Sequence, residues 1–137
     1  MEVVLRKVRE ALSQDAVIAA SVATYGVGAR AAPAVFVNVV PHDAQMRYVV
    51  ITPTQVTAQD DGGVVCRAII ALDVWDAAEK GEQALAVAGR AQQVLVSSGG
   101  LLLGDGRGRA WFDYESGPML VPEEGVDIQH AQAGVLA

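Results

Sequence analysis

Residues Val64–Ser98 read VVCRAIIALDVWDAAEKGEQALAVAGRAQQVLVSS, and this stretch decides the fold. Its first part, Val64–Trp75, predicts the longest strand of the chain because apolar residues recur there with a period of two. One face is uniformly apolar (Cys66, Ala68, Ile70, Leu72, Val74), whereas the other is mixed (Val65, Arg67, Ile69, Ala71, Asp73, Trp75). This contrast is typical of a sheet that helices cover on one side only.

The second part of the stretch predicts a long helix over Ala77–Ser98. It is rich in Ala, Gln and Glu, and its apolar residues recur at spacings of three and four. We expect Asp76 to cap the helix at its start and Gly99-Gly100 to end it. Gly89 is costly in a helix interior, so it suggests a close approach of a strand or another helix.

Further elements flank this unit on both sides. The N-terminal part predicts a helix over Glu2–Gln14 and a second, short one over Ala16–Ala23 that Asp15 caps. Strands are expected at Val35–Val40, Tyr48–Gln55, Arg109–Tyr114 and Val126–Leu136, with turns at Asp60–Gly63 and Glu115–Pro118 and a loop over Met119–Gly125. Pro53 indicates an edge position or a bulge.

These elements predict one domain over residues 1–137 of the α+β class. We expect an antiparallel or mixed β-sheet of about five strands, with an N-terminal helix and one long helix packed on one face.

The charge balance argues against direct binding of nucleic acid. The 137-residue chain has 10 basic and 16 acidic residues, which gives a net charge of −6. Its basic clusters are short, at Arg6-Lys7-Arg9 and Arg107-Arg109. Cys66 is the single cysteine, which excludes an internal disulfide and a multi-cysteine metal site. The charged N-terminus does not resemble a signal peptide, and no apolar run has the length of a membrane span, so no membrane partner is expected.

Catalytic patterns are weak throughout the chain. A Ser/His/Asp constellation would combine His130 and Asp113 with Ser97, Ser98 or Ser116, but no nucleophile-elbow motif supports it, and His130 is interpreted as a surface histidine. A metal site at His42, Asp43 and Asp60-Asp61 lacks ligand spacing, and the acidic pair is typical of a hairpin turn. The run Gly99–Gly108 lacks the terminal residues of a phosphate loop. We therefore expect no catalytic residue, cofactor or metal.

Several stretches resemble the tail-terminator and tail-completion proteins of long-tailed bacteriophages. The match lies in the two N-terminal helical segments, in Tyr48–Ile51, in Arg67–Trp75 followed by Ala84–Leu95, and in Trp111–Tyr114 followed by Val126–Leu136. The resemblance implies a structural virion protein, made in the host cytoplasm and located in the tail or neck. Copies would form a ring, typically a homohexamer, that caps the tail tube and joins it to the head connector.

In such a ring the partners would be other copies of the chain, the tail tube protein and the head–tail connector protein. DNA would pass through the lumen without specific binding, which the acidic balance favours. Candidate interface segments are the turn-rich Tyr25–Met46, Gly99–Arg109 and Met119–Gly125. Candidate interface residues are Arg67, Asp73, Trp75, Arg107, Arg109, Glu123 and Glu124.

Other functions remain open at this point. The chain could be another neck or tail component, such as a connector stopper or a tube subunit. From other classes, a small-molecule binding domain or an enzyme built from scattered residues would need a concave pocket with convergent polar groups.

Overall fold

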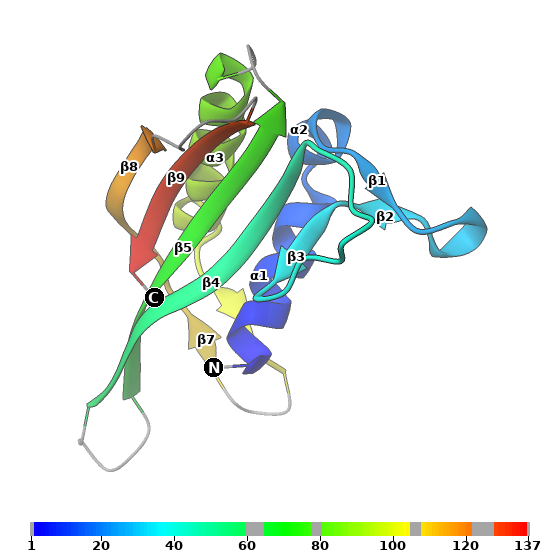
Figure 1. The fold of residues 1–137 in the computed structure, drawn as a ribbon. Coiled ribbons are helices and arrows are strands. Elements are labelled where there is room, and N and C mark those ends of the chain that lie inside the picture. The colour runs from blue at the N-terminus through cyan, green and yellow to red at the C-terminus, as the bar shows by residue number, and fades with distance from the viewer. Residues whose placement is uncertain (1, 60–64, 78–80, 105–107, 122–127, 137) are drawn as a thin grey trace.

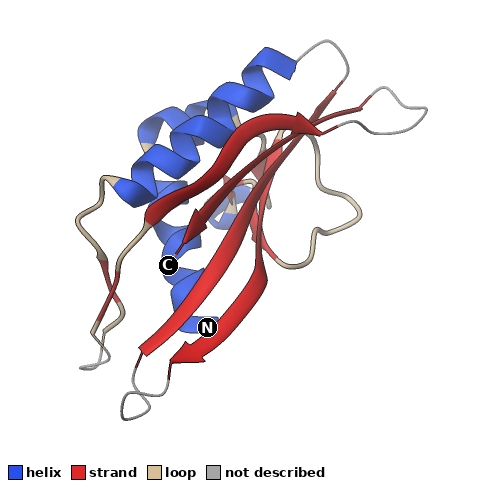
Figure 2. Ribbon diagram, turned by 90° about the vertical axis from the view of Figure 1, so that its left-hand side faces the viewer, coloured by secondary structure: helices blue, strands red, loops and turns tan. Residues whose placement is uncertain are grey.

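The computed structural model describes residues 2–59, 65–77, 81–104, 108–121 and 128–136. It has two layers, a five-stranded sheet of order β3-β4-β5-β9-β8 and helices α1, α2 and α3 on one of its faces (Figures 1 and 2). Strand β3 (Val35–Val37) is parallel to β4 (Tyr48–Gln59), and the other neighbouring pairs are antiparallel. The predicted α+β class and the one-sided helical layer are confirmed.

The central strand and the long helix lie where the sequence places them, with shifted ends. Strand β5 runs over Val65–Ala77, and α3 runs over Gly81–Val96. Ala68, Ile70, Leu72 and Val74 of β5 are buried beneath the helices, as their alternation predicts. The Cys66 side chain lies outside the described part.

The predicted helix cap at Asp76 is wrong. Asp76 lies inside β5, and its carboxylate accepts a hydrogen bond from the backbone N–H of Ala77. The strand continues two residues further than its apolar run because its alternation extends to Asp76, which follows Val74 on the helix-covered face. The residues between β5 and α3, 78–80, lie outside the description.

The N-terminal helices are confirmed. Helix α1 spans Glu2–Gln14 and buries Leu5, Val8 and Leu12 against the sheet and α3. Helix α2 spans Ala16–Ser21, a shorter range than predicted. The carboxylate of Asp15 caps it by accepting a hydrogen bond of 3.1 Å from the backbone N–H of Ile18.

Strand β4 confirms both expectations for Pro53. Its register with β5 shifts between Pro53 and Gln55, which marks a bulge. Strand β3 pairs with β4 only as far as Ile51, so Pro53 also lies at a sheet edge. The predicted turn at residues 60–63 lies outside the described part.

The Tyr25–Met46 segment forms small local structures. Strands β1 (Thr24–Tyr25) and β2 (Ala32–Pro33) pair with each other around a short 3-10 helix at Gly28–Arg30. Strand β3 is shorter than the predicted Val35–Val40 because Asn38 adopts a φ of +62°, which ends the extended backbone.

The last third differs most from prediction. The single strand predicted over Arg109–Tyr114 is divided between β7 (Arg109–Ala110), which pairs with β6 (Leu101–Leu102), and β8 (Asp113–Val121). The predicted turn at Glu115–Pro118 is wrong because these residues lie within β8, and β8 also includes Met119 of the predicted loop. Strand β9 (Ile128–Leu136) confirms the closing strand.

Strand β8 remains paired with β9 by bulging. Its register shifts between Tyr114 and Ser116 and again before Met119. Gly117 has a φ of +70°, and a Cβ there would lie 2.5 Å from the backbone oxygen of Gln132. Glycine is therefore required at this close approach.

Helix α3 packs against β8 and β9 and stabilises their position on the core. The buried amide of Gln92 donates to the backbone oxygens of Ser116 and Gly134, at 2.9 and 3.0 Å. A Cβ on Gly89 would lie 3.4 Å from Cγ of Pro118, so the predicted close approach at Gly89 is made by β8.

Candidate functional site

The sheet face turned away from the helices is the first candidate site, and we call it the open face. Antiparallel register partners share a face, so Tyr48, Trp75 and His130 form one cross-strand row, and Val50, Asp73 and Gln132 form the next. Phe36 of β3 extends the second row because it pairs with Val50 of β4. The alternation of β4, β5 and β9 thus places these side chains on one face of the sheet.

Aromatic rings cluster on and beside the open face. Phe36 makes edge-on contacts with Tyr25 and Tyr48, with ring centroids 5.3 and 6.0 Å apart. Burial among these groups raises the pKa of Tyr48. In the row that contains Tyr48, the rings of Trp75 and His130 stack with centroids 4.0 Å apart and planes 7° apart. Rigid rings of this kind provide contact area at little entropic cost.

A polar cluster adjoins the stacked pair. Oδ1 of Asp73 is hydrogen bonded to Nε2 of His130 at 2.6 Å and accepts from the amide of Gln132 at 3.0 Å. The interpretation of His130 as a surface histidine is wrong, since it is 8% exposed. His130 and Gln132 share a face by alternation, but only the pairing of β9 with β5 places both beside Asp73.

The predicted interface residues are divided among several places. Arg67, Asp73 and Trp75 lie on the same face of β5, where Asp73 and Trp75 meet through His130. Arg109 lies apart on β7, with its guanidinium 5.8 Å from the ring centroid of the exposed Trp111. Arg107, Glu123 and Glu124 lie outside the described residues.

A second site, which sequence reasoning missed, is centred on Arg47. Its Nε donates to Oδ2 of Asp76 at 2.6 Å, one terminal nitrogen donates to the backbone oxygen of Ser21 at 2.5 Å, and the other donates to Oε1 of Gln83. The Asp76 side chain is 7% exposed, so this ion pair is largely removed from water. The signal was present in the sequence, because a carboxylate on the apolar face of a strand requires a partner.

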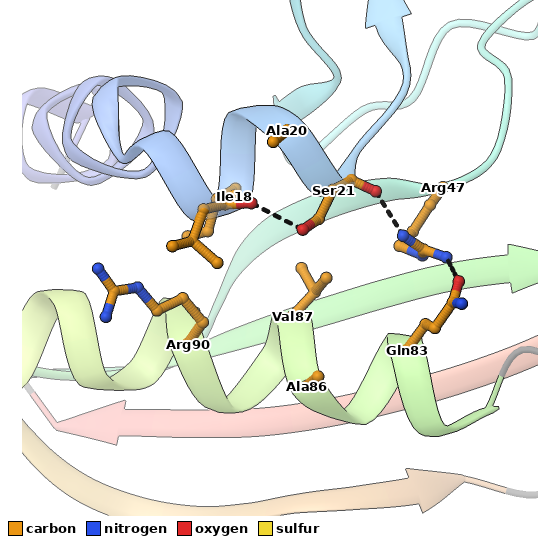
Figure 3. A pocket seen from close by; sticks show the side chains of 9 residues that line it. Ile18, Ala20, Ser21, Arg47, Gln83, Ala86, Val87 and Arg90 are labelled. Carbon is orange, nitrogen blue, oxygen red and sulfur yellow. Dashed lines mark hydrogen bonds between the residues drawn. The ribbon is translucent and has the colours of Figure 1, made fainter.

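A cavity of about 330 Å³ lies between α2 and α3, next to this ion pair (Figure 3). Its lining includes Val17, Ile18, Val87, Arg47 and Arg90. Arg90 donates to both carboxylate oxygens of Asp15, at 2.8 and 3.1 Å. These hydrogen bonds lower the pKa of the Asp15 carboxyl, against the opposing effect of burial. The guanidinium groups of Arg47 and Arg90 are both hydrogen bonded to protein oxygens. They therefore stabilise the packing of α2 and α3 and do not form an anion site.

The residues of the weighed Ser/His/Asp constellation do not converge. His130 pairs with Val121 of β8, whereas Asp113 pairs with Leu136 at the opposite end of β9. His42 is exposed in the connection between β3 and β4. Across the described ranges, no group of three or more His, Cys, Asp or Glu side chains is placed to hold a metal ion. Nor is any helix within those ranges long and apolar enough to cross a membrane.

Comparisons with known proteins agree on one kind of structure. The family model described as tail completion protein gp17 matches residues 6–116. A solved chain from the virion of a native gene transfer agent particle superimposes with a TM-score of 0.65 and is 26% identical in sequence. The similarity covers 94% of this chain and 88% of that one. No curated protein matches the sequence.

Proposed function

We propose a ring-forming function for this chain on the premise that it belongs to the tail completion protein gp17 family, whose model matches residues 6–116. The chain is a structural protein of the virion, located in its tail or neck, and it assembles with other tail or head components. The proposal adds that several copies, typically a homohexamer, close into a ring. This ring caps the tail tube protein and joins it to the head–tail connector protein.

The family match is the observation that carries this function. The organisation of the chain supports it, because contacts distributed over repeated heterologous interfaces can hold a ring together without chemistry. The proposal accordingly assigns no reaction and no cofactor to the chain. The net charge of −6 suits a lumen through which DNA passes without being retained.

We assign contact with an assembly partner to the open face, including the predicted residues Arg67, Asp73 and Trp75. Aromatic side chains are enriched where protein interfaces hold most of their binding energy. Arg109 and the exposed Trp111 form a separate candidate contact on β7 and the residue following it. Both surfaces lie outside the helix-covered core (Figure 2).

Assembly in the absence of the chain tests the function. Particles should be produced with the gene deleted and with the gene restored in trans, then examined by negative-stain electron microscopy. We expect separate heads and tails without the protein and joined particles after restoration. Native mass spectrometry of the purified protein, or of the neck released from particles, should show a ring about six times the mass of one chain. Joined particles in the absence of the protein would refute the proposal.

A further inference from the structure

We propose that adjacent copies in the ring contact one another through opposite edges of the sheet. Side chains of β8 in one copy pack against the β1–β3 edge of the next. The contact rests on the proposed ring function, and the partner at each edge is a second copy of the same chain. Four observations support this contact. Both edges expose apolar side chains, and the two edges are different surfaces of the molecule. Neither edge is open to regular strand pairing, and the charges that reach the two edges are opposite in sign.

Of the ten exposed large apolar side chains in the described part of the chain, six lie on β8 or in the β1–β2 and β3–β4 connections. On β8, Tyr114, Met119 and Leu120 are 60%, 47% and 45% exposed. At the other side of the molecule, Val27, in the connection between β1 and β2, is 89% exposed. Two apolar side chains in the connection between β3 and β4 are also exposed, Val39 and Met46. Grouped apolar exposure of this kind marks surfaces that a partner covers.

The positions of these groups satisfy the geometry of a ring. Strand β8 ends the sheet on one side, and β3 ends it on the other (Figure 1). A closed ring of more than two copies needs two different surfaces on each copy, which meet head to tail. A single self-complementary surface would instead give a dimer. The two apolar edges provide the required pair of surfaces.

Both edges are protected against regular strand addition. The contact between copies is therefore made by side chains and not by backbone hydrogen bonds. The register of β8 shifts twice, and Pro118 in its middle has no N–H to donate. On the opposite edge, the backbone oxygen of Val35 already accepts a hydrogen bond of 2.9 Å from Nε of Arg9. Side-chain packing between such edges is selective, whereas a regular open edge would pair with any exposed strand.

Charge favours the same arrangement. Asp113 and Glu115 are exposed on β8, which has no basic residue between Asp113 and Val121. Helix α1 lies beside β3 and exposes Glu2 and Glu10 as well as Arg6 and Arg9, but the charge that reaches the edge itself is Arg9. Complementary charges of this kind orient an association and discourage contacts between like edges.

Cysteine cross-linking in assembled particles tests the contact. In a Cys66→Ala background, we would make Met119→Cys, Val39→Cys and the double variant, and treat each with a short bis-maleimide. The double variant should give a ladder of linked chains that ends at the ring. A mixture of the two single variants should give linked dimers only, and each single variant alone should give none. The matched control combines Met119→Cys with Leu102→Cys, whose wild-type side chain is exposed on β6, in the separate sheet of β6 and β7.

The outcomes separate this inference from the proposed function. Cross-linking of the Met119/Val39 pair at least tenfold above the control supports edge-to-edge contact. Dimers from Met119→Cys alone would reveal a self-complementary contact and overturn the inference. Rings detected by native mass spectrometry with no cross-link above the control would overturn the edge contact while leaving the ring intact. Failure to find a ring in purified protein or particles would overturn both.

Discussion

The imidazole of His130 lies flat on the indole of Trp75, with ring centroids 4.0 Å apart, although the two residues come from different strands. A hydrogen bond between Nε2 of His130 and Oδ1 of Asp73 holds the imidazole in this position. The stack and the hydrogen bond together hold β5 and β9 in one register on the open face. This region is therefore part of the structural framework as well as the surface that we propose for contact.

Trp75→Ala should lower the free energy of unfolding by about 2 kcal/mol, because it removes the stacked contact of a half-buried ring. Urea unfolding followed by circular dichroism measures the loss. Trp111→Ala is the matched control, since Trp111 is 64% exposed and its loss should change stability by less than about 0.5 kcal/mol. Equal effects of the two substitutions would contradict the stacked arrangement.

Asp73→Ala should cost about 1–3 kcal/mol because it leaves His130 and Gln132 without their shared acceptor. A double-mutant cycle with His130→Ala, again by urea unfolding, should show coupling of at least about 0.5 kcal/mol. His42→Ala provides the comparison for an exposed histidine and should have no measurable effect on stability. Strict additivity of Asp73→Ala and His130→Ala would refute the contact.

Arg47→Met should destabilise the protein by about 3–5 kcal/mol, because it leaves Asp76 charged and unpaired beneath the helices. The double variant Arg47→Met/Asp76→Leu removes both charges and should recover most of that loss. Thermal and urea unfolding measure both variants. A double variant no more stable than Arg47→Met would show that the ion pair is not the source of the effect.

Asp15 should make stability depend on pH in the acid range. Its pKa is lowered in the folded state by hydrogen bonds from Arg90, so its contribution is complete above the unfolded pKa of about 3.9. The contribution is lost as the pH falls through the lower folded value. Asp15→Asn retains a capping side chain but should be less stable than wild type at pH 7, with the difference disappearing at low pH. Asp15→Ala should cost about 1 kcal/mol more through the lost cap. A difference that does not vary between pH 7 and pH 2 would contradict this assignment.

The sequence predicted those elements whose pattern is local. The alternation from Ala68 to Val74 identified the central strand and its buried face, and the carboxylate of Asp15 marked the start of α2. The predictions at Glu115–Pro118 failed because Gly117-Pro118 is typical of turns, while pairing with β9 keeps it within a bulged strand. Local preference was overridden there by contacts between distant segments.

The candidate site was predictable only in part for the same reason. Asp73 and Trp75 were placed on one face from the period of β5 alone. Their partner His130 lies more than fifty positions further along the chain, and only the strand order β5-β9 brings it into contact. Arg47 is similar, since its three acceptors belong to α2, β5 and α3. The sequence pattern suggested a need for a partner at Asp76 but did not identify one.

The three hydrogen bonds of Arg47 also determine which parts of the molecule open together. Helix α2 has only six residues and could not persist alone, but one guanidinium links its C-terminal end to the end of the central strand and the first turn of the long helix. In native-state hydrogen exchange, amides of α2 and of the first turn of α3 should therefore exchange as one cooperative unit. Local unfolding of the short helix α2 is thus coupled to opening of the elements that it covers.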